Sequence, residues 1–226
     1  MNQPYRATSI PASSSAEIDD GARRVLRNTW TLLALTLAFS AVMAYVAMAM
    51  NWPPVGLLAL VGYFGLLFLT MALRNSAWGL LAVFALTGFM GATMGPIINI
   101  YMNALGNGNQ IVMAAFGTTA AAFVGLSGFA LVSKRDFSFM GPFLFVGILV
   151  AFVASLAAYF FSMPALSLAV SAMFALLMSG LILYQTQQII RGGERNYIMA
   201  TVTLFVSIYN MFMSLLHLFG FAFGEE

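Results

Sequence analysis

The sequence predicts an all-α polytopic membrane protein with seven transmembrane helices. Only 7% of the 226 residues are charged, 62% are hydrophobic, and apolar stretches of about twenty residues recur along the chain. A helix of that length crosses the hydrocarbon layer of a bilayer. The sequence contains no Cys and one His, which excludes disulfides, thiolate metal sites and multi-histidine metal sites. We therefore expect no metal and no cofactor.

The first 22 residues differ from the rest of the chain. They read MNQPYRATSIPASSSAEIDDGA, rich in Ser, Pro, Ala and acid, with no apolar period. This composition predicts a disordered cytoplasmic tail over 1–22, followed by a transmembrane domain over 23–226. A signal peptide is the alternative interpretation of paired Arg before an apolar run. That run continues for about twenty residues and six more spans follow it, which favours a membrane helix.

The spans follow one another with short polar or Pro/Gly breaks between them. Their predicted ranges are 29–50, 54–73, 77–101, 111–132, 141–162, 165–189 and 197–221. The basic residues all fall in the N-terminal tail or in the second, fourth and sixth loops. They are Arg6, Arg23, Arg24, Arg27, Arg74, Lys134, Arg135, Arg191 and Arg195. The positive-inside rule then predicts a cytoplasmic N-terminus and a periplasmic C-terminus.

Small residues four positions apart predict close helix packing, because apolar side chains alone do not hold helices together in lipid. They are Gly91 and Gly95 in the third span, Gly117, Ala121 and Gly125 in the fourth, and Ser167, Ser171, Ala175 and Ser179 in the sixth. The third span also contains Pro96 and Asn99, a combination typical of a kinked or locally opened helix.

A row of polar residues marks the seventh span. Thr203, Ser207, Asn210, Ser214 and His217 are spaced by four, three, four and three, so they share one helix face. Such a row is costly against lipid, which predicts a central seventh helix. With Gln185, Gln187 and Gln188 of the sixth span it forms a polar seam facing the cytoplasm. Two interpretations stay open: interhelical hydrogen bonds, or a solvated pocket or leak path.

The spans offer neither carboxylates nor a catalytic dyad. No Asp or Glu lies inside any span, so a proton relay or carboxylate cation site has no evident residues. Gly125–Gly128 and His217–Gly220 resemble the GxSG and HxxG elements of rhomboid proteases. Ser127 is expected near the cytoplasmic end of its helix and His217 near the outer end, more than about 10 Å apart in depth. We expect no catalytic residue and no enzyme.

Six long blocks carry a family resemblance. They are ARRVLRNTWTLLALTLAFSA (22–41), LVGYFGLLFLT (60–70), FALTGFMGATMGPIIN (84–99), SKRDFSFMG (133–141), PALSLAVSAMF (164–174) and IIRGGERNYIMATVTLFVSIYN (189–210). In this order they resemble the bacterial YccA branch of the Bax inhibitor-1 family, over nearly everything after residue 21.

The resemblance implies a multi-pass protein of the bacterial inner membrane that binds and restrains FtsH, a membrane-anchored ATP-dependent protease. The implied partners are FtsH with HflK and HflC and the lipid bilayer, and not nucleic acid. Because FtsH engages flexible cytosolic termini, the tail is the expected element of contact. Its candidate residues are Arg6, Glu17, Asp19 and Asp20.

Other branches of the family are similar to a pH-sensitive calcium leak with two facing Asp residues on the sixth and seventh helices. Those positions fall on Gln185 and Ser207 here, while the following Asn is kept as Asn210. Neither Gln nor Ser titrates near neutral pH, and Ca²⁺ favours carboxylate oxygens. We expect a Gln185–Ser207 hydrogen bond to close the seam. The alternative function is a passive cation (Ca²⁺ or H⁺) leak or a small transporter.

Overall fold

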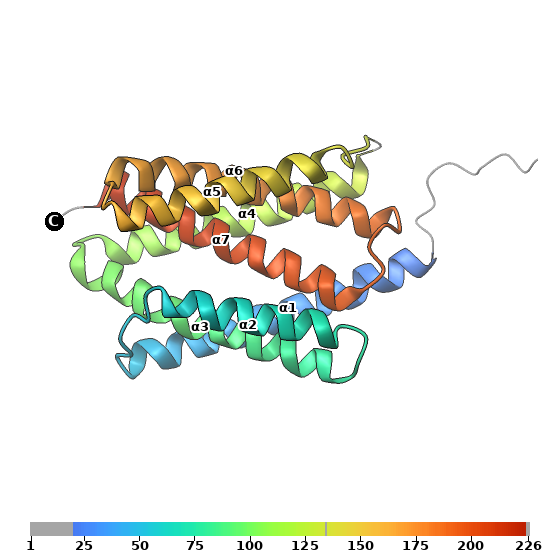
Figure 1. The fold of residues 1–226 in the computed structure, drawn as a ribbon, viewed down its shortest axis with the longest axis horizontal. Coiled ribbons are helices and arrows are strands. Elements are labelled where there is room, and N and C mark those ends of the chain that lie inside the picture. Colours follow the sequence, from blue (N-terminus) through green and yellow to red (C-terminus); the bar gives the residue numbers. More distant parts are fainter. Residues whose placement is uncertain (1–19, 134, 225–226) are drawn as a thin grey trace, which may run out of the picture.

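The structure is a computed structural model, and it describes residues 20–133 and 135–224. Within them all regular structure is helical, in an elongated bundle (Figure 1). The helices are α1 (Asp20–Ala49), α2 (Leu58–Leu73), α3 (Trp78–Ala104), α4 (Gly108–Val132), α5 (Met140–Phe160), α6 (Pro164–Ile190) and α7 (Tyr197–Phe223).

Six of the described helices are long and apolar enough to cross a membrane, and α2 is not. At 16 residues α2 is about 24 Å long, shorter than the hydrocarbon layer of about 30 Å. The predicted span 54–73 included residues that form a turn instead. Pro53 and Pro54 lack backbone donors, and Gly56 has a φ of +60°, so the helix begins only at Leu58.

The first helix begins earlier than predicted, at Asp20 rather than residue 29. A carboxylate in the first turn interacts favourably with the helix dipole, and Ala and Arg are good helix formers. Residues 20–22 therefore belong to α1 and not to the expected tail. Of the tail candidates, Asp20 is exposed in this first turn, while Arg6, Glu17 and Asp19 lie outside the described residues.

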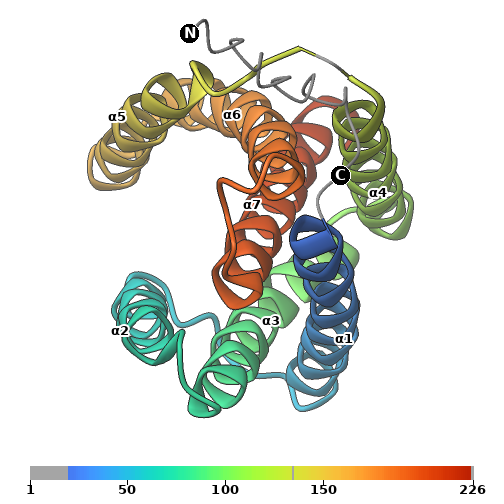
Figure 2. The same cartoon turned by 90° about the vertical axis from the view of Figure 1, so that its right-hand side faces the viewer.

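Helix α7 lies in the middle of the bundle (Figure 2), packed against α1, α3, α4 and α6. This agrees with the central position expected from its polar row. Helix α3 is as deeply buried as α7, which its sequence did not indicate. Helices α2 and α5 lie at the periphery, where α2 packs on α3 and α5 packs on α6. An edge-to-face ring contact joins these two helices, with 5.9 Å between the ring centroids of Phe64 of α2 and Phe152 of α5.

The most extensive helix contact joins α1 to α3. A methyl group added at Gly91 would overlap the backbone carbonyl oxygen of Ser40, and one at Gly95 would overlap that of Ala44. The predicted close packing of the third span is confirmed. The helix continues through Pro96 without a break, so the expected local opening does not occur.

The small residues of the fourth span do not pack as predicted. Apart from the neighbouring residues and the surrounding backbone of α4 itself, no described atom lies within 4 Å of a methyl group placed at Gly117 or Gly125. Helix α4 instead buries Ile111, Ala115 and Thr119, and it packs on α7 and α6. The spacing of small residues defined a stripe correctly, but it could not say which face of the helix meets its neighbours.

The two glycine stripes give a matched stability test. Gly91→Ala should lower the free energy of unfolding in detergent by about 1–3 kcal/mol, because the methyl group forces α1 away from α3. Gly117→Ala on the open face should leave stability unchanged or slightly raised, since Ala favours helix more than Gly. Thermal unfolding of the purified variants measures both. Equal losses would show that α1–α3 contact is not special.

Candidate functional site

The described arginines gather at one end of the bundle. They are Arg23, Arg24, Arg27, Arg74, Arg135, Arg191 and Arg195, at the start of α1 and in the loops α2–α3, α4–α5 and α6–α7. We call this the basic end. Hydrogen bonds from Gln187 and Asn196 to neighbouring loops hold it together.

Gln187 fastens the α4–α5 loop to the end of α6. Its Nε2 donates to the carbonyl oxygen of Arg135, and its Oε1 accepts from the backbone N–H of Phe137 at 2.6 Å. Arg191 Nη2 donates to the same Arg135 carbonyl oxygen at 2.8 Å, and its Nη1 lies 3.2 Å from Asp136 Oδ2. The buried amide of Gln187 thus replaces backbone partners that the loop lacks.

The Asp136 carboxylate is fully exposed. Hydrogen bonds from Ser138, with a smaller effect of the nearby Arg191 guanidinium, hold the pKa of Asp136 below its usual value. Because water screens an exposed ion pair, the amide of Gln187 and not this salt bridge is the main tie of the loop.

Asn196 fastens the α2–α3 loop to the start of α7. As the N-cap of α7, its Oδ1 accepts from the backbone N–H groups of Ile198 at 3.0 Å and Met199 at 3.1 Å. Its Nδ2 donates to the Arg74 carbonyl oxygen and to Asn75 Oδ1, each at 3.0 Å. Sequence reasoning missed this residue. An Asn just before an apolar run signals a helix start, but nothing local indicates its partners in another loop.

The α6–α7 turn requires glycine at one position. Gly192 has a φ of +73°, which L side chains rarely adopt. A methyl group at Gly193 would overlap Gln188 Oε1, the flexible end of a side chain that can move aside. The carbonyl oxygen of Gln188 accepts from the backbone N–H groups of Gly193 at 2.8 Å and Glu194 at 3.1 Å. The predicted seam residue Gln188 therefore packs beneath this turn.

The expected hydrogen bond between Gln185 and Ser207 is not formed. Ser207 is fully buried and donates its hydroxyl proton to the carbonyl oxygen of Thr203 at 2.7 Å, one turn back on its own helix. Gln185 is 7% exposed, and its Nε2 has no hydrogen-bond partner among the described residues. The helix backbone is a nearer acceptor for Ser207 than the neighbouring helix.

The polar row of α7 divides into two groups. Thr203 and Ser207 lie in the half of α7 nearer the basic end. Asn210, Ser214 and His217 line a cavity of about 260 Å³ toward the opposite end, together with residues of α3 and α6. There His217 Nδ1 lies 2.8 Å from Ser171 Oγ of α6. The expected single seam is therefore two separate polar sites.

Their contacts with α6 show that Ser127 and His217 do not form a catalytic dyad. Ser127 Oγ lies 3.4 Å from Thr186 Oγ1, whereas His217 contacts Ser171. Thr186 and Ser171 are both on α6, and their separation corresponds to about 22 Å of helix. A nucleophile and its base need contact at about 3 Å. Proton transfer between the two residues is excluded.

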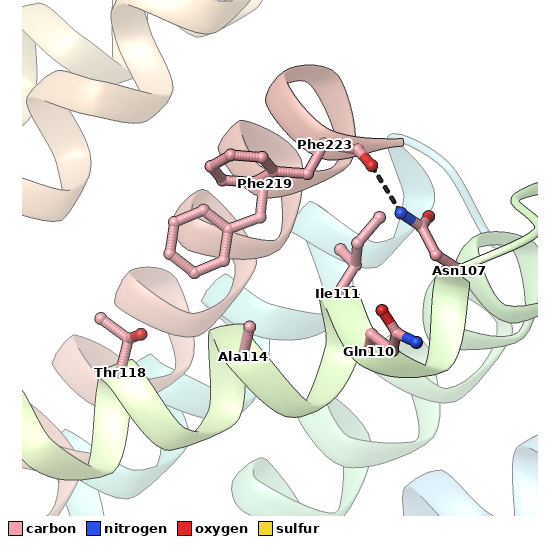
Figure 3. A pocket seen from close by; sticks show the side chains of 7 residues that line it. All are labelled: Asn107, Gln110, Ile111, Ala114, Thr118, Phe219 and Phe223. Atoms are coloured by element: carbon pink, nitrogen blue, oxygen red, sulfur yellow. Dashed lines mark hydrogen bonds between the residues drawn. The ribbon is translucent and has the colours of Figure 1, made fainter. Parts of the chain in front are cut away.

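A shallow groove between α4 and α7 opens at the end opposite the basic end (Figure 3). Its volume is about 260 Å³, and it is lined by Asn107, Gln110, Ile111, Ala114, Thr118, Phe219 and Phe223. Asn107 Nδ2 donates to the Phe223 carbonyl oxygen at 2.6 Å, which ties the α3–α4 turn to the end of α7. Helix α7 is thus held at both ends. Within the described chain, no group of three or more His, Cys, Asp or Glu could hold a metal.

Comparison with known proteins gives a family. A family model described as "Inhibitor of apoptosis-promoting Bax1" matches residues 22–224. An uncharacterized protein of Pseudomonas aeruginosa is 54% identical over 203 residues, covering 89% of this chain and 91% of that protein. The Escherichia coli K12 protein named "Modulator of FtsH protease YccA" is 50% identical over 200 residues, covering 88% and 90%. A Vibrio cholerae membrane protein is 41% identical over 222 residues, covering 97% of each chain.

Asn196 can be tested against a second asparagine at a helix start. Asn196→Ala should lower the free energy of unfolding by about 1–2 kcal/mol. Helix α7 loses its N-cap, and two acceptors in the α2–α3 loop lose the amide that donates to them. Asn109→Ala, at an exposed position in the first turn of α4, is the control and should change little. Thermal unfolding in detergent measures both, and equal effects would reject the assigned role of Asn196.

Two glutamines of α6 should respond in opposite ways to Leu. Gln187→Leu leaves the Arg135 carbonyl and the Phe137 N–H without their partner, so stability should fall by about 1–3 kcal/mol. Gln185→Leu removes a buried Nε2 that has no partner, so stability should stay level or rise. Unfolding midpoints of the two variants decide. A loss at Gln185 as large as at Gln187 would mean that Gln185 has a partner.

Proposed function

This chain belongs to the Bax inhibitor-1 family, and from that premise we propose that it binds the membrane protease FtsH and restrains its action on other membrane proteins. The observation that carries the proposal is the relative named "Modulator of FtsH protease YccA", 50% identical over nine-tenths of that protein. A second Escherichia coli relative is named "Inner membrane protein YccA". The chain is a multi-pass protein of the bacterial inner membrane.

In the proposed topology all seven helices cross the membrane, α2 included. Helix α1 ends far from the basic end, where Asn51 accepts a hydrogen bond from Asn99 near the end of α3. Helix α3 begins at the basic end, where Gly79 lies against the side chain of Ile198 of α7. The chain between them must return across the bundle, and α2 with its flanking turns makes that return.

The proposed orientation has the basic end in the cytoplasm. All the described arginines lie there, and the positive-inside rule assigns such loops to the cytoplasmic side. The end of α7 and the α3–α4 turn then face the periplasm. Since α1 starts at the basic end, the segment before Asp20 also lies on the cytoplasmic side, where an ATP-dependent protease could reach it.

We place the contact with FtsH in the segment 1–19, with Asp20 at its junction to α1. Pulling on this segment draws on α1 first. Helix α1 makes the most extensive helix contact of the bundle, with Ser40 and Ala44 close against the glycines of α3. Separating them inside lipid gives up close backbone packing, which the flexible lipid tails replace less completely. A substrate that is engaged but slow to extract occupies the protease and so restrains it.

The proposed role is not enzymatic. Ser127 and His217 contact residues of α6 that are about 22 Å apart along that helix. The relatives carry the names of a modulator or of uncharacterized proteins. We include HflK and HflC as partners because the proteins that the sequence blocks resemble bind FtsH together with HflK and HflC.

Deletion of residues 2–19 tests the contact. This deletion keeps Asp20 and all of α1, so the bundle should unfold at the same temperature as the full-length protein. It should abolish co-purification with FtsH and the dependence of the protein's turnover on FtsH. Affinity purification in mild detergent with mass spectrometry, and turnover after synthesis is stopped, measure these effects.

Removal of Glu225 and Glu226 from the other terminus is the matched control and should change neither property. Full-length protein that is recovered without FtsH, under conditions that keep the FtsH complex intact, would reject the proposed function. Retention of FtsH by the 2–19 deletion would reject only the place of contact.

A further inference from the structure

The one histidine of the sequence lies in the polar cavity between α3, α6 and α7. We call this the His217 cavity, and its lining is Ile97, Tyr101, Ser171, Asn210, Met213, Ser214 and His217. It lies toward the end opposite the arginines. Neither the proposed contact with FtsH nor the α1–α3 packing uses it.

Ser171 holds the Nδ1 side of the His217 ring. Its hydroxyl oxygen lies 3.0 Å from the carbonyl oxygen of Ser167 and 2.8 Å from His217 Nδ1. A Ser171 proton donated to Ser167 leaves the imidazole proton on Nδ1, with Ser171 as its acceptor. The lone pair then lies on Nε2, for which the described residues provide no hydrogen bond. Metal-binding histidines are commonly oriented in this way, through the nitrogen that does not bind the metal.

Met213 supplies a second donor to the same cavity. It precedes His217 by four residues on α7, so the two side chains share one face in adjacent turns. A thioether is a soft ligand that favours Cu⁺, and imidazole also binds copper. Among the described residues that line the cavity, none has the carboxylate that Ca²⁺ or Mg²⁺ favours. A thioether with one imidazole therefore favours a soft ion of low charge over Ca²⁺ or Mg²⁺.

We propose that the His217 cavity binds one soft monovalent metal ion, Cu⁺ in the cell, through His217 Nε2 and Met213 Sδ. Both ligands are neutral, so the bound site carries a single positive charge. The side-chain oxygens of Tyr101, Asn210 and Ser214 also line the cavity, where they can stabilise that charge. Ser171 is a positioning residue that holds the imidazole. The site is independent of the proposed action on FtsH.

A protein with one histidine permits a direct test by nitrogen NMR. Full-length protein labelled with ¹⁵N-histidine should show one imidazole, with the proton on Nδ1 and a bare Nε2. Ag⁺, which resembles Cu⁺ and is stable in air, should shift the Nε2 resonance and saturate at one equivalent. An imidazole protonated on Nε2, or an Nε2 resonance unmoved by Ag⁺, would overturn the proposal.

Variants locate the second ligand. Met213→Leu conserves volume and should keep the unfolding temperature, yet weaken Ag⁺ binding at least about tenfold in a competition assay with a Cu⁺ or Ag⁺ chelator. Ser171→Ala should weaken it about tenfold and also mix the two tautomers in the NMR spectrum. The matched control is Met113→Leu, at a residue of α4 that is 75% exposed on the outside of the bundle.

The outcomes separate a site from scattered binding to the 16 methionines of the chain. Loss with Met213→Leu and no loss with Met113→Leu supports the assigned pair. Equal losses, or binding of several equivalents that survives His217→Ala, would show that Ag⁺ binds methionines at large and would overturn the proposal. Zn²⁺ that competes equally with Ag⁺ would overturn the assigned softness of the site.

Discussion

Helices in lipid gain little from burying apolar side chains against one another, because lipid tails are as apolar as Leu or Phe. The bundle therefore depends on the place where two backbones meet, the crossing of α1 with α3. Gly91 and Gly95 permit the approach, and the carbonyl oxygens of Ser40 and Ala44 occupy the space that a side chain would fill. Helices α1 and α3 both pack against α7, so the α1–α3 pair also supports the central helix.

The central helix is fixed at its ends by amide side chains. Asn196 joins its start to the α2–α3 loop, and Asn107 joins its last turn to the α3–α4 turn. Gln187 does the same for the α4–α5 loop. These bonds lie at the bundle ends, where the helix backbones leave loop carbonyls and N–H groups without helical partners. A bundle braced in this way is suited to a protein that a protease engages by one terminus and unfolds slowly.

The helices themselves could be predicted from apolar length, and most predicted boundaries lie within a few residues of those observed. What could not be predicted was the side of a helix that meets its neighbours. The stripe at Gly91 packs while the similar stripe at Gly117 faces outward, although both show the same spacing. Hydrogen-bond partners were harder still to predict. Ser207 bonds to the backbone of its own helix instead of Gln185, and the polar row ending at His217 divides into two sites. Spacing along one helix carries no information about the groups on the helix opposite.

We propose that the bundle restrains FtsH because it is engaged but extracted slowly. Reconstitution of FtsH in proteoliposomes with this protein and a second membrane substrate tests this proposal through the degradation rate of that substrate. The wild-type protein should slow degradation of the second substrate, whereas the Gly91→Ala variant should itself be degraded faster and should slow the second substrate less. Unchanged degradation of the second substrate in the presence of the wild-type protein would reject the proposal.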